Sequence, residues 1–199
     1  MSVGYQKEKM KVAGFTIARN IVKADYPLRE ALLSVLPLCD DFVIAVGDSD
    51  DGTKEYLQAM QEPKIRLFDT IWDDNKRVGG AVLADETNKA LATVPTDADW
   101  LLYIQADECL HERYVPMVRA AMEKYLHDDE VDALLFDYLH FYGNYSMVGD
   151  SRRWYRNEIR IIKNHRNIIS WKDAQGFRTA DAKKLKVAHC GACIYHYGW

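Results

Sequence analysis

The chain carries an amide and two carboxylates directly after an apolar run, in the order Gln105, Asp107 and Glu108. Carboxylate oxygens are ligands that Mg²⁺ and Mn²⁺ prefer, and a divalent cation stabilises negative charge on a departing phosphate group as a Lewis acid. Because neighbouring residues of a strand point to opposite faces, we expect Asp107 to be the cation ligand and Glu108 to be structural. Gln105 forms hydrogen bonds but binds cations poorly.

Two more polar clusters follow apolar runs that are typical of strands. Arg19 and Asn20 come after the first run, and Asp48 and Asp51 come after the second. In open parallel sheets ligands bind outside the carboxyl ends of the strands, so these residues and Asp107 are expected to meet at one crevice. A second interpretation stays open, in which the three aspartates only cap turns and helix N-termini.

The elements that must position these residues alternate along the chain. A first helix is expected to begin at Pro27, which suits the start of a helix. Further helices are expected over residues 54–60, 81–94 and 112–128. Strands are expected over residues 11–18, 41–47, 64–70, 100–106, 131–143, 158–164 and 186–199. Strands and helices that alternate at this spacing predict an α/β fold with a mostly parallel sheet covered by helices on both faces.

Length and charge limit the classes of protein. With 199 residues, of which 48% are hydrophobic, the chain is expected to form one domain. The net charge of −4 is unevenly spread, since residues 150–199 hold 11 Lys and Arg against 4 Asp and Glu. This pattern favours an anionic small ligand or an acidic acceptor over nucleic acid. A solvated basic face is the other interpretation.

Apolar runs long enough to span a membrane do not occur in the sequence. A spanning helix needs roughly 20 apolar residues, and the N-terminal residues contain no apolar signal region. We therefore expect a cytoplasmic protein that can associate peripherally with a membrane.

In order along the chain, these motifs resemble those of family 2 glycosyltransferases. The segment TIARN (16–20) resembles the end of the family's first strand, and VGDSDDGT (46–53) resembles its second-strand segment. The glycines before ADETNKAL (84–91) and the strand end YIQADE (103–108) are similar to the next two motifs. The tail, with EIRIIKN, WKDAQGF and HYGW, resembles that of a subset of these enzymes. Gln105 stands where the family's DxD motif usually has its first Asp.

This resemblance implies a GT-A fold, which is Rossmann-like, and inverting transfer of a sugar from a nucleotide-sugar donor to an acceptor hydroxyl. Residues 1–108 would form the nucleotide-binding half and residues 109–199 the acceptor and catalytic half. The final HYGW suggests that a C-terminal segment is missing. The cation would be Mn²⁺ or Mg²⁺, held by Asp107 and completed by His196, with His189 as the weaker match.

The donor is expected to be a UDP-sugar, because a carboxylate such as Asp48 or Asp51 can accept the uracil N3–H. Arg160 is expected to neutralise phosphate, since guanidinium groups bind phosphate in bidentate fashion. A solvated strand face is its alternative role. The full set of expected donor-binding residues is Thr16, Ala18, Arg19, Asn20, Asp48, Asp51, Gly79, Asn88, Gln105 and Arg160.

Inversion requires a general base that takes the proton of the attacking hydroxyl. The resemblance and the order along the chain favour Asp173, with Asp150 and Glu158 as competitors. The acceptor is expected to be a glycan, a lipid-linked compound or another hydroxyl compound. Two other functions stay open: a non-catalytic domain that binds nucleotide-sugars or serves as a scaffold, and a nucleotidyltransferase.

Overall fold

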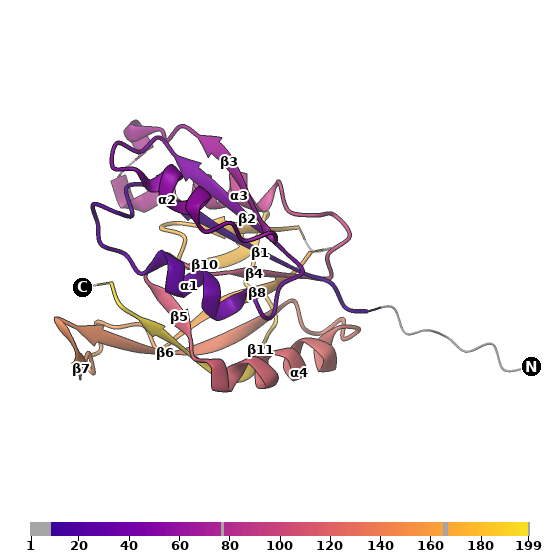
Figure 1. Cartoon of the computed structure of the whole chain (residues 1–199). Coiled ribbons are helices and arrows are strands. Elements are labelled where there is room, and N and C mark those ends of the chain that lie inside the picture. The colour runs from indigo at the N-terminus through magenta and orange to yellow at the C-terminus, as the bar shows by residue number, and fades with distance from the viewer. Residues whose placement is uncertain (1–8, 77, 165–166, 199) are drawn as a thin grey trace, which may run out of the picture.

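The computed structural model describes residues 9–76, 78–164 and 167–198. The strands of its large sheet are β1 (Val12–Ala18), β2 (Asp41–Gly47), β3 (Ile65–Thr70), β4 (Trp100–Tyr103), β5 (Glu108–Leu110), β6 (Ala133–Tyr142), β7 (Asn144–Val148), β8 (Asn157–Lys163) and β11 (Val187–His196). Their order is β3-β2-β1-β4-β8-β6-β11-β5, with β7 paired to β6 (Figure 1). A separate hairpin consists of β9 (Ile168–Trp171) and β10 (Gly176–Thr179).

Four α-helices and three short 3₁₀ turns accompany the strands in the described part of the chain. The helices are α1 (Leu28–Val35), α2 (Thr53–Ala59), α3 (Ala81–Leu91) and α4 (Val115–Tyr125). The 3₁₀ turns are η1 (Asp74–Lys76), η2 (Val78–Gly80) and η3 (Glu112–Tyr114). None of these helices has the length and apolar character that crossing a membrane requires.

The N-terminal half of the sheet is parallel. Strands β3, β2, β1 and β4 lie side by side in the same direction, and the interior of β1 and β2 is buried on both faces. Helices α1 and α2 pack on one face, and α3 packs on the other. In α1 the buried residues are Leu28, Ala31, Leu32 and Val35, which share one side of a helix because of its 3.6-residue period.

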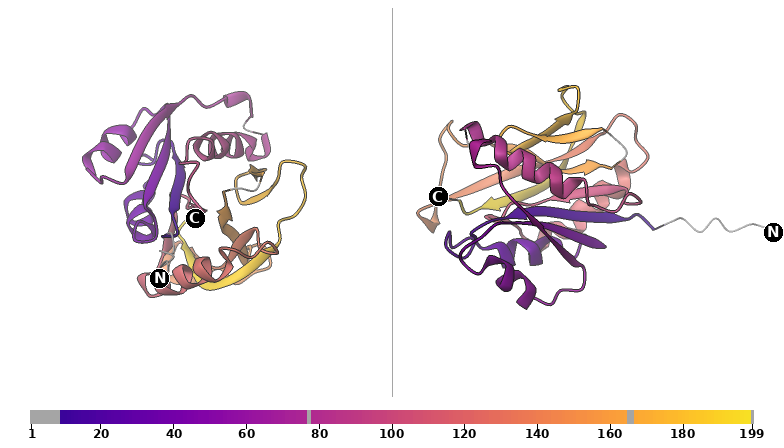
Figure 2. Two further views of the ribbon diagram at one scale, coloured as in Figure 1. Left: turned by 90° about the vertical axis from the view of Figure 1, so that its right-hand side faces the viewer. Right: turned by 90° about the horizontal axis from the view of Figure 1, so that it is seen from above.

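The C-terminal half of the sheet is mixed. Strand β8 runs antiparallel to both β4 and β6, whereas β11 runs parallel to β6 and antiparallel to β5. Helix α4 covers β11, and the β9–β10 hairpin packs with α3 on the opposite face (Figure 2). The prediction of an α/β fold with a mostly parallel sheet and helices on both faces is confirmed, and antiparallel strands extend that sheet.

Two predicted elements differ from the observed ones. The strand expected over 100–106 ends at Tyr103, because the chain turns there and the Glu108 N–H donates to the Gln105 carbonyl over 3.2 Å. The helix expected over 112–128 differs in its bounds, because residues 112–114 form a 3₁₀ turn and α4 ends at Tyr125, but the kink or start that the sequence predicts near Pro116 is confirmed by the start of α4 at Val115. Asp107 therefore lies in a tight turn between β4 and β5, and Glu108 is the first residue of β5.

Candidate active site

A cleft of about 390 Å³ opens at the carboxyl ends of β1 and β4. The polar side chains that line this cleft come from several segments of the chain. Those used below are Arg19, Trp72, Gln105, Asp107, Tyr155, Asp173 and His196. An adjoining hollow of about 370 Å³ shares Arg19 and Trp72 and adds Asn20 and Gly80. Of the residues expected to meet at one crevice, Arg19 and Asp107 line the cleft and Asn20 lines the adjoining hollow, whereas Asp48 and Asp51 line neither.

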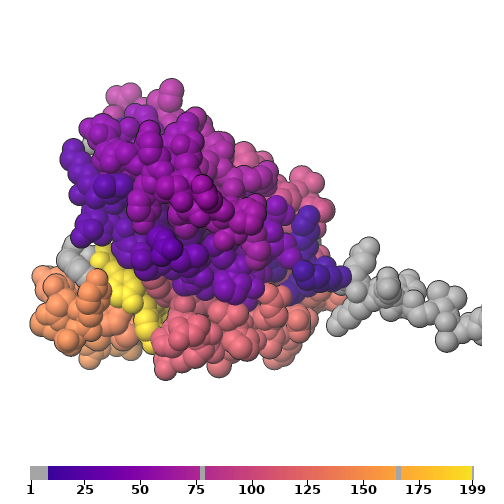
Figure 3. Space-filling model, viewed as in Figure 1, coloured from indigo at the N-terminus to yellow at the C-terminus, as the bar shows by residue number. Residues whose placement is uncertain are grey.

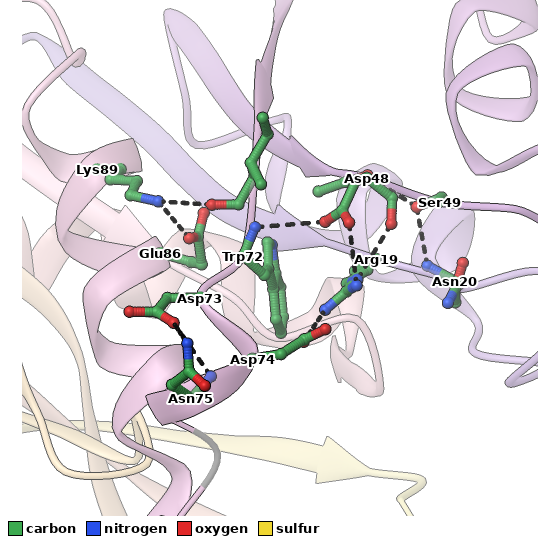
Figure 4. Close-up of polar contacts among 12 residues, drawn as sticks. Arg19, Asn20, Asp48, Ser49, Trp72, Asp73, Asp74, Asn75, Glu86 and Lys89 are labelled. Carbon is green, nitrogen blue, oxygen red and sulfur yellow. Dashed lines mark hydrogen bonds and ion pairs between the residues drawn. The ribbon is translucent and has the colours of Figure 1, made fainter.

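Arg19 anchors the β1 side of the cleft (Figure 4). Its Nη2 and Nε donate to the Asp48 carboxylate and carbonyl, both over 3.1 Å, and its Nη1 donates to Asp74 over 3.1 Å. The guanidinium also lies 5.3 Å from the centre of the Trp72 ring. The second Asp48 oxygen accepts the Trp72 N–H over 3.3 Å. These contacts fix an arginine and an aromatic face at the mouth of the cleft.

Asn20 and Asp51 join the loops after β1 and β2. The Asn20 Oδ1 accepts from the Asp50 N–H, and the Asn20 N–H donates to Ser49 Oγ, each over 3.1 Å. Asp51 accepts from the Thr53 N–H and hydroxyl, at the start of α2, and from the Lys23 N–H. For Asp51 the structure therefore shows the turn-capping role, because these donors engage both of its carboxylate oxygens.

Side-chain alternation separates Thr16 and Ala18 from the cleft. Both are buried on the opposite face of β1, where the Thr16 hydroxyl donates to the Ile104 carbonyl over 2.5 Å. Ile17, between them, is the strand residue that lines the cleft. Ile17 therefore supplies the side chain that lines the cleft from β1, and the contact expected between the donor and the backbone groups of Thr16 to Arg19, which does not involve these side chains, stays a prediction.

Asn88 and Gly79 also lie outside the cleft. The Asn88 amide pairs with the Ser170 backbone, donating over 3.1 Å and accepting over 2.7 Å, and so fastens α3 to β9. Because the nitrogen and the oxygen of the Asn88 amide are both bonded to the Ser170 backbone, the prediction that Asn88 contacts the donor is wrong. Gly79, at φ 68°, borders open space, whereas Gly80, at φ 72°, packs so closely on Asp173 that an added Cβ would lie 2.6 Å from the Asp173 Cβ.

Arg160 and Glu108 form a fully buried ion pair. Arg160 Nη2 and Nε donate to Oε1 and Oε2 of Glu108 over 2.7 and 2.9 Å, and Tyr138 donates to Oε1 over 2.8 Å. Burial alone would raise the pKa of Glu108, but the Arg160 guanidinium outweighs it and the pKa is lowered. Arg160 is 1% exposed. The predicted phosphate contact of Arg160 is therefore wrong, because the guanidinium is committed to Glu108.

Asp107 faces the opposite way, into the cleft. Its carboxylate keeps 18% of its surface exposed, and burial together with the nearby Glu108 charge raises its pKa to about 6. A carboxylate under these conditions gains from a neighbouring positive charge, because that charge offsets both the lost hydration and the repulsion. The tight turn after β4 thus places one carboxylate in the core and its neighbour in the cleft.

His196, at the end of β11, points its Nε2 at Asp107 Oδ2 across 3.5 Å. Its Nδ1 lies 3.2 Å from His140 Nδ1, and His140 Nε2 lies 2.7 Å from the Tyr155 carbonyl. Because a carbonyl only accepts, His140 must donate from Nε2, which leaves its Nδ1 to accept from His196. Burial lowers the pKa of both imidazoles, which favours their neutral forms. His196 therefore presents an unprotonated Nε2 to a carboxylate.

This pair fits a divalent cation. Two lone-pair donors that face each other without a proton between them repel, and a cation between them removes that repulsion. No group of three or more His, Cys, Asp or Glu that could hold a metal occurs among the described residues, so this pair alone would not complete the coordination of a cation. Gly198 packs against Asp107 and His196 where an added Cβ would collide with both.

Asp173 and Gln105 close the cleft on the side of the β9–β10 hairpin. Gln105 Nε2 donates to the Ala174 carbonyl over 3.4 Å, which joins the turn after β4 to the turn that carries Asp173. Of the competing carboxylates, Asp150 lines a different hollow, near β7, and Glu158 lines a second cleft beside β9 and β10. Asp173 is thus the one of the three that lies in the same cleft as Asp107.

Several cleft residues were not predicted from the sequence. Trp72 packs over Gly47, whose missing side chain leaves room for the indole. Tyr26 also lines the cleft, and His140 orients His196 from behind. A glycine directly before Asp48 indicates that another group can pack closely against this strand end. Nothing local in the sequence identifies Trp72 as that group.

Comparison with solved structures agrees with this architecture. A structure of S. aureus TarS matches 94% of this chain and 37% of that chain, with a TM-score of 0.60 and 17% identity. A TarS fragment, residues 1–349, matches 68% of this chain and 37% of its own, at TM-score 0.49 and 19% identity. Glucosyl-3-phosphoglycerate synthase from Mycobacterium tuberculosis, in complex with Mn²⁺, UDP and glucosyl-3-phosphoglycerate, matches 67% and 45%, at TM-score 0.43 and 17% identity.

No protein-family profile and no curated protein matches the chain. The chain spans less than half the length of the solved structures that it resembles. At 17% identity the likeness to TarS shows the fold, and it confirms the predicted GT-A-like architecture.

Proposed function

We propose that this chain is a glycosyltransferase of the family 2 type, which moves a sugar from a nucleotide-sugar donor to an acceptor hydroxyl with inversion. One observation carries the proposal. The Asp107 carboxylate and the His196 Nε2 face each other across 3.5 Å in a cleft at the ends of parallel strands, and a second carboxylate, Asp173, lines the same cleft. Residues 1–108 would bind the donor, and residues 109–199 would bind the acceptor and supply the base.

On the donor side, Asp107 and His196 would hold Mn²⁺ or Mg²⁺. The bound cation would supply Lewis-acid stabilisation of the charge on the departing diphosphate. Trp72 offers a face on which a nucleobase can stack, and Asp48 beside it can accept a base N–H, which is why a UDP-sugar is the preferred donor. Arg19 adds positive charge at the same end. Gln105 can hydrogen-bond the ribose.

On the acceptor side, Asp173 would act as the general base. The acceptor oxygen forms a bond to the anomeric carbon while the bond from that carbon to the diphosphate oxygen breaks. The hydroxyl proton passes to the Asp173 carboxylate, and the bonding electrons leave with the nucleoside diphosphate. Gly80 holds the Asp173 backbone in place through its close contact.

The setting proposed for this activity is polysaccharide biosynthesis in the cytoplasm. The acceptor would be a glycan, a lipid-linked compound or another hydroxyl compound, and the enzyme would associate with the membrane only peripherally. Nucleic acid is not part of the proposal, since the overall charge is −4.

The first test is a thermal-shift screen of UDP, GDP, CMP and dTDP with and without Mn²⁺. We expect UDP with Mn²⁺ to raise the melting temperature by about 5–10 °C at a hundredfold excess over Kd. Asp107→Asn should abolish the Mn²⁺-dependent part of the shift. Asp69→Asn is the matched control, because this exposed carboxylate pairs with Lys54 and does not line the cleft.

The second test measures transfer and donor hydrolysis with the corresponding nucleotide-sugars. Asp173→Asn should lower the turnover rate by about 10²–10⁴-fold and leave UDP binding unchanged. Binding without any turnover in the unaltered protein would instead identify a non-catalytic binding domain. Pyrophosphate-dependent chemistry would identify a nucleotidyltransferase.

A further inference from the structure

A second cleft, of about 540 Å³, adjoins the first. It lies between β8, the β9–β10 hairpin and the segment 184–187. Asp173 and Gln175 line both clefts, so the turn between β9 and β10 forms the wall that they share. A molecule in the second cleft would therefore have one end at the carboxylate proposed as the base.

The second cleft is bordered by cations that are held in place. The Lys172 Nζ lies 4.3 Å and the Arg178 Cζ lies 4.0 Å from the centre of the Trp171 ring, and Lys184 also lines the cleft. Stacking on an aromatic face restricts a charged side chain that would otherwise move freely. Trp171, over whose ring Lys172 and Arg178 lie, is itself 38% exposed, so this cluster is at the surface beside the cleft.

The acidic groups of this cleft are Asp173 and Glu158. Burial, with the nearby charges of Glu108 and Asp173, raises the pKa of Glu158 to about 7 against the opposing effect of Arg160. Near neutral pH a large share of Glu158 is therefore uncharged, and the cations Lys172, Arg178 and Lys184 outnumber the ionised carboxylates. Glu158 lies beside the turn that carries Asp173, since its Oε2 is 3.3 Å from the position of a Cβ on Gly176.

We propose that the second cleft binds the sugar acceptor, and that this acceptor is a hydroxyl compound that also carries a phosphate or carboxylate group. Its anionic group would contact Lys172, Arg178 and Lys184, and its hydroxyl would reach Asp173 at the shared wall. This inference rests on the proposed transferase function and names its acceptor class. The basic charge of residues 150–199 agrees with it.

The test compares pairs of probes that differ only in the anionic group. Glucose 6-phosphate, glucuronate and glucose, together with glycerol 3-phosphate and glycerol, are titrated into the full chain and followed by saturation-transfer NMR. We expect the phosphorylated or carboxylated member of each series to bind at least about tenfold more tightly, which corresponds to about 1.4 kcal/mol. The phosphate and carboxylate arms show which anion is preferred.

Variants locate the binding. Arg178→Ala and Lys172→Ala, singly and together, should weaken binding of the anionic probes, the double variant by at least about tenfold. Arg29→Ala, on the exposed side of α1, is the matched control and should have no effect. Mn²⁺-dependent UDP binding is measured in every variant and should stay unchanged, because that site lies in the first cleft.

The outcomes separate the two proposals. Equal binding of neutral and anionic probes, or anionic binding that survives the double variant, overturns the acceptor cleft while leaving the transferase proposal in place. Failure of the unaltered chain to bind any nucleotide with Mn²⁺ overturns the transferase proposal itself.

Discussion

The two halves of the sheet hold their polar groups in different ways. In the parallel half, the groups at the strand ends are partly exposed and are fixed by bonds between neighbouring loops, as with Arg19 and Asp48. In the mixed half, the corresponding groups are backed by buried partners, as with Glu108 on Arg160 and His196 on His140. The parallel half therefore fixes its polar groups through partly exposed contacts between loops, and the mixed half fixes them through buried partners.

The difference follows from how each half is built. Parallel strands bring their carboxyl ends to one edge, so their loops meet there without any need for charge in the core. Antiparallel additions place β8 between β4 and β6, and a buried charge on β8 then requires an internal counter-ion. Substitutions in the mixed half should therefore cost more stability than matched substitutions in the parallel half.

The largest effect is expected from breaking the buried ion pair. Glu108→Ala leaves the fully buried Arg160 guanidinium without its counter-ion, and we expect a loss of about 3–5 kcal/mol in the free energy of unfolding. Urea denaturation followed by circular dichroism measures it. Asp48→Asn, which removes a half-exposed pair in the parallel half, should cost about 1 kcal/mol or less. Equal losses in the two variants would contradict the contrast between the halves.

An intermediate effect is expected at His140. His140→Phe keeps a ring between Tyr138 and Trp154 but removes the nitrogen that accepts from His196. The orientation and tautomer of His196 are then no longer fixed, and Mn²⁺ affinity in the presence of UDP should fall about 10–100-fold. Electron paramagnetic resonance titration of free Mn²⁺ measures this affinity. His189→Phe is the control. It alters an exposed histidine of β11, the strand that also carries His196, and should leave the Mn²⁺ affinity unchanged.

The smallest effect concerns Glu158. Because its folded-state pKa is raised from 4.5 to about 7, the folded protein holds this proton more tightly than the unfolded chain. That contribution to stability is complete below about pH 4.5 and is lost as the pH rises to about 7. Because glutamine cannot ionise, Glu158→Gln does not lose this stability as the pH rises. Its melting temperature should exceed that of the unaltered chain by a few degrees at pH 8 and by less at pH 5, as calorimetry would show. The same difference at both pH values would count against a raised pKa.

Local sequence patterns predicted the parallel half well. The strand expected over 41–47 is β2 to the residue. Of the three strand ends expected to meet at one crevice, the first contributes Arg19 and the last contributes Gln105 and Asp107, whereas Asp48 and Asp51 do not line the cleft. Apolar periodicity and turn residues act over a few positions, and in a parallel α/β unit such local signals also determine where the strand ends meet.

The mixed half depends on register between distant strands, which no local pattern contains. His140 faces His196 only because a bulge in β11, with Gly191 at φ 77°, shifts the pairing with β6 between His189 and Cys193. Likewise, Arg160 pairs with Glu108 because of where the pairing of β8 places it. From the sequence only its charge was known, and that charge suggested a contact with phosphate. Roles that such long-range contacts decide could be settled only from the structure.

The end of β11 ties the cleft to the tail of the chain. The Tyr197 N–H donates to the Asp107 carbonyl over 2.8 Å, and Gly198 fills the space against the Asp107 carboxylate and the His196 ring. In the space-filling view, the yellow C-terminal residues lie beside the orange residues of β6 and β7 and below the indigo to purple N-terminal segments (Figure 3). Loading the pocket with an ion should therefore slow amide exchange at Tyr197. By thermodynamic linkage, a binding partner that displaces residues 197–198 from Asp107 would in turn weaken the binding of the ion.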